Sequence, residues 1–185
     1  MVIALCFSPL SYAETNSQAF FHRVEAKVIN PQQLQLGVDI DLQLSNELKS
    51  ALHKGMPLFF TLDVKLYEPR QFWFNRLIHQ DSYTMGLRYN MLLREWRVSS
   101  NQREFKAFSL EDAVKYITHL NNWRVLLTQS LQTSQMYEGY IRLRLDTSLL
   151  ARPFQITAFN SSSAWSFSSS WVNFNFHSLD QKQNK

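Results

Sequence analysis

Two carboxylates, Asp39 and Asp41, come closest to a known chemistry in residue type and spacing. They alternate with apolar residues, so a strand would place both on one face with their Cα atoms about 6.8 Å apart. Paired carboxylates at this separation suit the acid and base of a glycoside hydrolase. The pattern is more typical of a solvent-facing strand, on which Lys65, Arg142 or Arg144 would pair with these acids. We favour this surface interpretation and keep hydrolysis as an alternative.

The five histidines do not form a recognised metal-binding motif. His79 and Asp81 would share one strand face, but the sequence offers no third ligand nearby. The only cysteine, Cys6, lies in a segment that we expect to be removed, and neither H-E-x-x-H nor G-x-S-x-G occurs. We therefore predict no metal site, no cofactor and no enzymatic activity.

The run Phe72-Trp73-Phe74 is the strongest aromatic feature of the chain. Neighbouring residues of a strand face opposite ways, so the two phenylalanines in the core would leave Trp73 on the other face. Arginines stacked on an exposed Trp are typical of a protein-binding hot spot. The competing interpretation, which we favour, is a Trp73 covered by a helix or by a second layer. The candidate partner-contact residues are Trp73, Arg88, Arg94 and Arg97.

The elements that would carry these residues are mostly strands. Apolar and polar residues alternate from Leu34 to Leu44, and again within 58–66 and 141–145, which predicts strands with one solvent-facing side. Less regular candidates, rich in aromatic and β-branched residues, are 20–28, 71–79, 83–92, 95–99, 123–131, 154–159 and 165–176. Roughly ten such strands predict a mainly β fold, a two-layer antiparallel β-sandwich of immunoglobulin-like or similar type.

Two short helices interrupt these strands. The first has Ser45 or Asn46 as its N-cap and Gly55 just after its end, and the second begins with Ser109 and Asp112 as a capping pair. Because each helix follows one strand and precedes another, a parallel crossover would fit at the short limit of such connections. An α+β fold is therefore the alternative.

Residues 1–13 have the pattern of a secretion signal, an apolar run that ends in Ser11-Tyr12-Ala13. The run is too short to span a bilayer. We expect export to the periplasm, a single domain over residues 14–179 and a mobile tail over 180–185. The formal net charge of +4 comes from scattered basic residues, so we expect no nucleic-acid partner.

A series of core and aromatic positions follows in order along nearly all of the expected mature chain. It comprises Leu52, Gly55-Met56-Pro57-Leu58-Phe59-Phe60, Arg70, Trp73-Phe74, Leu87-Arg88-Tyr89-Asn90-Met91-Leu92, Trp96-Arg97-Val98, Ser109-Leu110, Ala113 and Leu143-Arg144-Leu145-Asp146. This series resembles the bacterial domain of unknown function 4390 family. The resemblance implies an exported protein of a Gram-negative bacterium, and it suggests a membrane sensor histidine kinase as a partner. None of these positions is catalytic, so the resemblance implies no activity.

The function that we expect is a non-catalytic periplasmic protein-binding module. Its partner would be an envelope protein such as the ectodomain of a sensor kinase. Two alternatives stay open: a small outer-membrane β-barrel, which also has alternating strands and many aromatic residues, and an envelope hydrolase that uses Asp39 and Asp41. The sequence leaves the partner's identity and the oligomeric state open.

Overall fold

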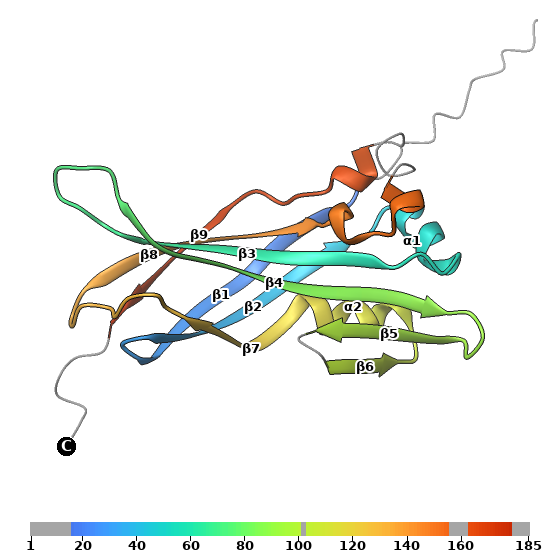
Figure 1. Ribbon diagram of the computed structural model, residues 1–185, viewed down its shortest axis with the longest axis horizontal. Coiled ribbons are helices and arrows are strands. Elements are labelled where there is room, and N and C mark those ends of the chain that lie inside the picture. Colours follow the sequence, from blue (N-terminus) through green and yellow to red (C-terminus); the bar gives the residue numbers. More distant parts are fainter. Residues whose placement is uncertain (1–15, 101–102, 156–162, 179–185) are drawn as a thin grey trace, which may run out of the picture.

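The computed structural model describes residues 16–100, 103–155 and 163–178 (Figure 1). The expected signal peptide, residues 1–13, and the expected tail, residues 180–185, lie outside the described residues. Within the described part, no helix has the length and apolar character needed to cross a membrane.

Two antiparallel sheets form the body of the protein (Figure 1). The smaller sheet has the strand order β1-β2-β7, formed by β1 (Gln18–Asn30), β2 (Gln33–Gln43) and β7 (His119–Leu126). The larger sheet has the order β6-β5-β4-β3-β8-β9, formed by β6 (Arg103–Ala107), β5 (Glu95–Ser100), β4 (Arg76–Asn90), β3 (Leu58–Glu68), β8 (Met136–Leu145) and β9 (Val172–His177). The predicted mainly β, sandwich-like architecture is confirmed. The suggested parallel crossover is wrong, because every strand pair among the described residues is antiparallel.

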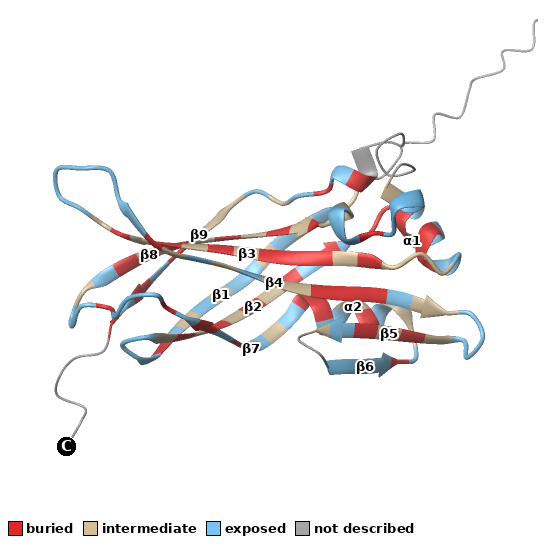
Figure 2. Ribbon diagram, in the orientation of Figure 1, coloured by how far each residue is buried: buried red, intermediate tan, exposed pale blue. Residues whose placement is uncertain are grey.

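The core lies between the two sheets and follows from the alternation in the sequence. Buried and less buried residues alternate along β2, and along β3 except at Thr61, which is also buried (Figure 2). An apolar side chain at every second position gives each strand one dry face, and burial of these two faces against each other drives the layers together. The core residues of these two strands are Leu34, Leu36, Val38, Ile40, Leu42, Leu58, Phe60, Leu62, Val64 and Leu66.

Two helices each link a strand of one sheet to a strand of the other, and both predicted N-caps are confirmed. In α1 (Asn46–His53), the Ser45 hydroxyl accepts a hydrogen bond from the Leu48 N–H at 3.3 Å, and Gly55 follows the helix with φ +81°. In α2 (Leu110–Thr118), the Ser109 hydroxyl accepts from the Asp112 N–H at 3.0 Å. This helix packs against β2 and β7 of one sheet and β5 and β6 of the other, so it bridges the two layers.

Several predicted strand boundaries are wrong. Residues 71–75 form a loop, and β4 begins only at Arg76. Residues 152–155 are helical, and the rest of the candidate strand 154–159 lies outside the described residues. The candidate strand 165–176 overlaps the end of a 3₁₀ turn over Ser163–Ser166, and β9 itself begins only at Val172. Strand β6 escaped prediction because four of its five residues are exposed, so it has no apolar alternation.

Candidate binding groove

The outward face of the larger sheet carries the most organised polar side chains. Asp63, Lys65 and Tyr67 alternate with core residues along β3, so they point away from the smaller sheet. Their partners on β8 lie directly opposite and share this face: Arg142 faces Asp63, and Tyr140 faces Lys65. The strand register therefore gathers acidic, basic and aromatic groups on one surface.

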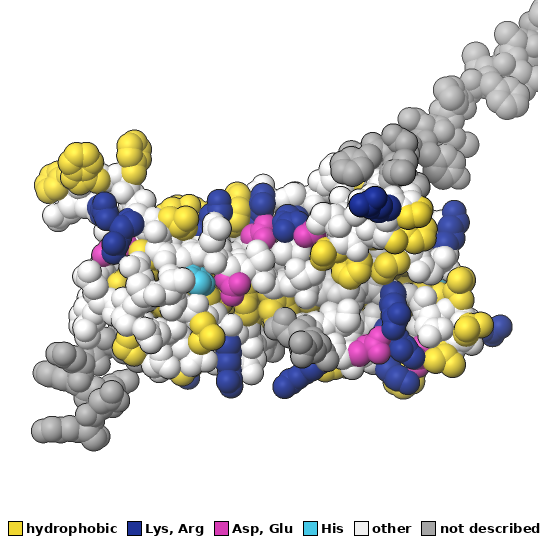
Figure 3. Space-filling model, in the orientation of Figure 1, with side chains coloured by type: hydrophobic (Ala, Val, Ile, Leu, Met, Phe, Trp, Pro, Cys, Tyr) yellow, Lys and Arg dark blue, Asp and Glu magenta, His cyan; other side chains and the backbone are white. Residues whose placement is uncertain are grey.

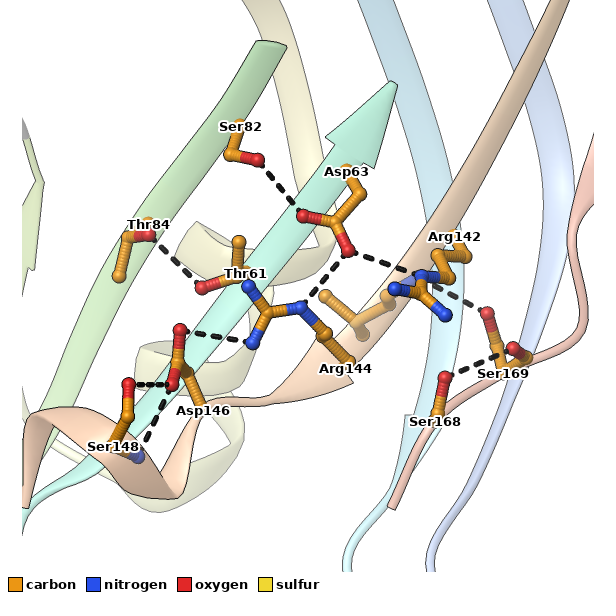
Figure 4. A network of polar contacts seen from close by, with 11 residues as sticks. Thr61, Asp63, Ser82, Thr84, Arg142, Arg144, Asp146, Ser148, Ser168 and Ser169 are labelled. Atoms are coloured by element: carbon orange, nitrogen blue, oxygen red, sulfur yellow. Dashed lines mark hydrogen bonds and ion pairs between the residues drawn. The ribbon is translucent and has the colours of Figure 1, made fainter. Parts of the chain in front are cut away.

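Asp63 is the centre of a polar network (Figure 4). Its Oδ2 accepts hydrogen bonds from the Nε atoms of Arg142 at 3.0 Å and Arg144 at 2.9 Å, and its Oδ1 accepts from the Ser82 hydroxyl at 2.8 Å. Arg144 also binds Asp146 through Nη1 at 2.9 Å. Within the described residues, the terminal nitrogens of Arg142 have no hydrogen-bond partner, so they can bind a ligand.

The surroundings of Asp63 keep it ionised. Its side chain is only 14% exposed, and this burial alone would raise its pKa. Hydrogen bonds from Arg144, Ser82 and Arg142 outweigh burial and hold the pKa below the usual 3.8. A carboxylate that stays ionised at neutral pH and is already bound to two guanidinium groups has no proton to donate. Asp63 is therefore suited to positioning the arginines rather than to acid catalysis.

Trp171 forms one wall beside this network. The Lys65 Nζ lies 5.0 Å from the Trp171 ring centroid, and the Arg142 Cζ lies 4.5 Å from it. Both distances are in the range of cation–π attraction. The chain before Trp171 is tied to β8, because the Leu143 N–H donates to the Ser169 hydroxyl at 3.0 Å and the Ser169 N–H donates to the Leu143 carbonyl at 2.8 Å. These bonds hold Trp171 over the sheet.

Two adjoining hollows, which we call the outer groove, share Lys65 and Trp171. The first has a volume of about 670 Å³ and a mainly aromatic lining: Tyr67, Trp73, Phe74, Asn75 and Tyr140. The second has a volume of about 550 Å³ and a mainly polar lining: Asp63, Gln80, Asp81, Ser82, Arg142 and Arg144. The groove thus changes from aromatic to charged along its length.

Trp73 lies in the β3–β4 loop, where it is 79% exposed beside Phe72 (88%) and Phe74 (97%). The exposure of Trp73 that the first interpretation required is confirmed, but its placement of the two phenylalanines in the core is wrong. The interpretation that we favoured, a Trp73 covered by a helix or a second layer, is also wrong. The Arg76 Nε donates to Glu68 Oε2 at 2.7 Å, which closes the loop at its base. Residues 69–75 then extend past the strand ends, where neither sheet covers them (Figure 1).

The three candidate arginines do not meet Trp73. Arg88 lies near the far end of β4, Arg94 lies in the β4–β5 turn with φ 51°, and Arg97 lies on β5 opposite Arg88. The stretch of β4 from Arg76 to Arg88 spans about 40 Å at the rise of an extended strand. The predicted stacking is therefore wrong.

At that far end, Arg88 and Arg97 bind acidic residues of their own sheet. The Arg88 Nη2 lies 2.8 Å from the Glu104 Oε1, and the Arg97 Nη2 lies 2.6 Å from the Glu95 Oε1. The hydrogen bond from Arg97 holds the pKa of Glu95 below its usual value, and the bond from Arg88 does the same for the pKa of Glu104. The Arg88–Glu104 pair is exposed and the Arg97–Glu95 pair is partly buried, and both link residues within the larger sheet.

The predicted carboxylate pair lies on the smaller sheet. Asp39 Oδ1 is 3.2 Å from the His119 Nε2 on β7, and Asp41 is exposed. Pairing with Lys65, Arg142 or Arg144 is wrong, because these residues belong to the larger sheet. The sequence does not show which strands share a sheet, so it could not show that Asp39 lies on a different sheet from these basic residues.

His79 and Asp81 do share one face of β4, since they lie opposite Leu66 and Val64. In the described part of the chain, however, no group of three or more His, Cys, Asp or Glu side chains is placed to hold a metal ion. Sequence reasoning missed the roles of Asp63 and Trp171. For Asp63 the signal was present, because it lies at a solvent-facing position of a clearly alternating strand.

The family model for the domain of unknown function DUF4390 matches residues 18–175. This range contains both sheets apart from the last residues of β9, and the chain belongs to this family. Comparison with curated proteins and comparison with solved structures gave no match.

Proposed function

We propose that this DUF4390 family member is a non-catalytic, exported binding module that takes an extended segment of an envelope protein into the outer groove. The observation that carries the proposal is the continuity of the groove, in which an aromatic hollow and a charged hollow meet at Lys65 and Trp171. Aromatic and arginine side chains in one depression are the groups that dominate binding energy at protein interfaces. Ser11-Tyr12-Ala13 supports export.

The two hollows define the chemistry of the bound segment. An apolar or aromatic side chain fits in the aromatic hollow, where it would pack against Tyr67 and Tyr140, whose own rings are in edge-to-face contact with centroids 5.6 Å apart. An acidic side chain fits where the charged hollow begins, because the ammonium of Lys65 has no carboxylate within 4.0 Å among the described residues. Arg142 adds its terminal nitrogens there, which have no hydrogen-bond partner in the part of the chain that the structure describes. The preferred segment therefore carries an apolar residue followed or preceded by an acid.

Catalysis by the groove has less support. Its central carboxylate, Asp63, is held ionised and bound, as is Asp146 beside it, where burial raises the pKa but hydrogen bonds from Ser148 and Arg144 lower it further. Both carboxylates therefore supply fixed negative charge, and neither holds a proton to donate at neutral pH.

Site-specific photo-crosslinking in the periplasm tests the proposal. A photoreactive amino acid replaces Tyr140 in the groove, and in a matched variant it replaces Arg124, which is exposed on the smaller sheet. We expect a discrete crosslinked protein from position 140 and none from position 124. Lys65→Glu should abolish the crosslink because it reverses the charge at the acidic end of the bound segment. Equal crosslinking from both positions, or none from either, would refute the proposal.

The partner class that we propose is the ectodomain of a membrane sensor histidine kinase. Its support is the family resemblance, together with the expected shared compartment. Binding of the purified ectodomain to the purified chain, measured by calorimetry, checks this choice. Affinity should fall with added salt, because the charged hollow supplies part of the attraction. Salt-independent binding, or no binding, would exclude this partner.

A further inference from the structure

The loop over residues 69–75, which we call the aromatic tip, combines bare aromatic rings with positive charge. Phe72, Trp73 and Phe74 are all almost fully exposed, and Leu77 just beyond them is nearly half exposed. The sequence from Pro69 to Gln80 contains Arg70 and Arg76 but no acidic residue. In Figure 3, hydrophobic side chains project from the corner of the molecule where this loop lies, with Lys and Arg side chains directly behind them.

Three consecutive exposed aromatic residues need an explanation, because such rings are normally buried. A stable protein interface needs about 800 Å² on each partner with a complementary shape. The aromatic tip is a convex apex and offers no such face by itself. A bilayer adapts to any shape that enters it, and the amphipathic ring of Trp concentrates at the membrane–water boundary.

We propose that the aromatic tip inserts Phe72, Trp73 and Phe74 into the interfacial region of a bilayer that contains anionic phospholipid. The rings enter the boundary between headgroups and acyl chains. Arg70, which is exposed and has no ion pair within the described residues, lies at the level of the phosphates. The formal net charge of +4 adds attraction over the distance of about a Debye length.

This anchor is separable from the outer groove, although the two adjoin. Trp73 and Phe74 line the aromatic hollow, whereas Phe72 lines neither hollow. Anchoring would place the aromatic end of the groove next to the membrane surface and its charged end further away. The groove would then meet the part of an envelope protein that lies close to its membrane anchor.

Co-sedimentation with vesicles tests the proposal on the purified chain from residue 14 onward. We expect binding to vesicles of equal parts phosphatidylcholine and phosphatidylglycerol, and weaker binding to phosphatidylcholine alone. Phe72→Ser should lower the partition coefficient on both vesicles by about tenfold or more. Arg70→Gln should lower it by about fivefold on the anionic vesicles only. Both residues are exposed, so neither change should affect folding.

Leu92→Ser is the matched control, since Leu92 is 95% exposed in the β4–β5 turn at the other end of β4. It should leave vesicle binding unchanged. If Leu92→Ser weakens binding as much as Phe72→Ser does, or if neither matters, the assignment of the anchor to the aromatic tip is wrong. Loss of the Tyr140 crosslink in Phe72→Ser without loss of vesicle binding would show that the tip contacts protein, which overturns this proposal and leaves the groove proposal standing.

Tryptophan fluorescence gives a second readout at the tip itself. Trp96, Trp123 and Trp165 are buried, and Trp171 is partly buried against the larger sheet. Trp73, which is 79% exposed at the tip, is therefore the indole whose surroundings change most on insertion. Vesicles with brominated acyl chains should quench the emission of the wild type, and Trp73→Phe should remove most of this quenching. Quenching that persists in Trp73→Phe would place the membrane contact elsewhere.

Discussion

Replacing Asp63 by asparagine tests whether the polar network fixes the outer face. The amide side chain would keep one acceptor oxygen but lose the negative charge that holds Arg142 and Arg144 together. The hydroxyl of Ser82 would also lose a charged acceptor. The expected result is a less stable protein in which the two guanidinium groups repel each other.

The size of the effect follows from the burial of the partners. A hydrogen bond to a charged group contributes about 1.5 to 3 kcal/mol when it is shielded from water. The Arg142 and Arg144 side chains are about a third exposed, so water replaces part of what they lose. Arg144 also keeps Asp146 as a partner. We therefore expect Asp63→Asn to lower the free energy of unfolding by about 1 to 2 kcal/mol at neutral pH.

The pH dependence gives the sharper result. Because folding lowers the pKa of Asp63, the folded state favours the ionised form, and this stabilisation is complete above the unfolded value of about 3.8. It is lost as the pH falls through the lowered pKa of the folded state. The amide of the Asp63→Asn variant cannot titrate, so the gap in stability between wild type and variant should shrink as the pH falls below 3.8.

Urea unfolding at neutral pH and at a series of acidic pH values measures both effects. The control is Asp41→Asn, which removes a carboxylate from an exposed position on the smaller sheet and should change stability by less than about 0.5 kcal/mol. The reasoning is refuted if Asp63→Asn is as stable as the wild type at neutral pH. It is equally refuted if the gap stays constant at a pH well below the folded pKa.

Three further results are expected. Gly139→Ala should lower stability by about 1 to 3 kcal/mol in urea unfolding because its Cβ would collide with the ring of Phe174, whereas Gly37→Ala, whose Cβ would find its nearest neighbour at 3.7 Å, should cost much less. Ser45→Ala should cost about 1 kcal/mol by removing the N-cap of α1, and no loss in thermal unfolding would contradict that role. Trp171→Ala should weaken partner binding by about thirtyfold, as truncation of a hot-spot aromatic does, with calorimetry as the measurement and an unchanged affinity as the contrary outcome.

The main strands were predictable because the alternation of apolar and polar residues shows which side chains are buried. In β2 every second residue is apolar without exception, so a shift by one position would expose the whole core face. The helix starts were equally predictable. The first N–H groups of a helix have no partner within the helix, and the hydroxyls of Ser45 and Ser109 are placed to accept hydrogen bonds from them. Strand alternation and helix capping both depend on residues that are close in the sequence, so they can be recognised without knowledge of the fold.

The aromatic tip could not be placed from its composition. Phe and Trp favour strands because strands are usually half buried, so their β-propensity reports an environment rather than a backbone preference. The loop after Glu68 projects past the sandwich, and there the same residues meet solvent. The β-propensity of Phe and Trp therefore gave a wrong prediction for this loop, because no second sheet covers it.

The outer groove illustrates why a site of this kind depends on strand order. Asp63 precedes Arg142 by 79 residues, and they meet only because β3 pairs with β8 in one register. A slip of one residue would turn Asp63 toward the core and leave a buried carboxylate without its arginines. Burial of an unpaired charge is strongly destabilising, so this register is disfavoured. Packing of the core face therefore determines the register of β3 and β8. This register determines which charged side chains lie next to one another on the opposite face. Changes in the packing of Leu62 or Leu66 should consequently alter ligand binding at the outer groove even though neither side chain lines it.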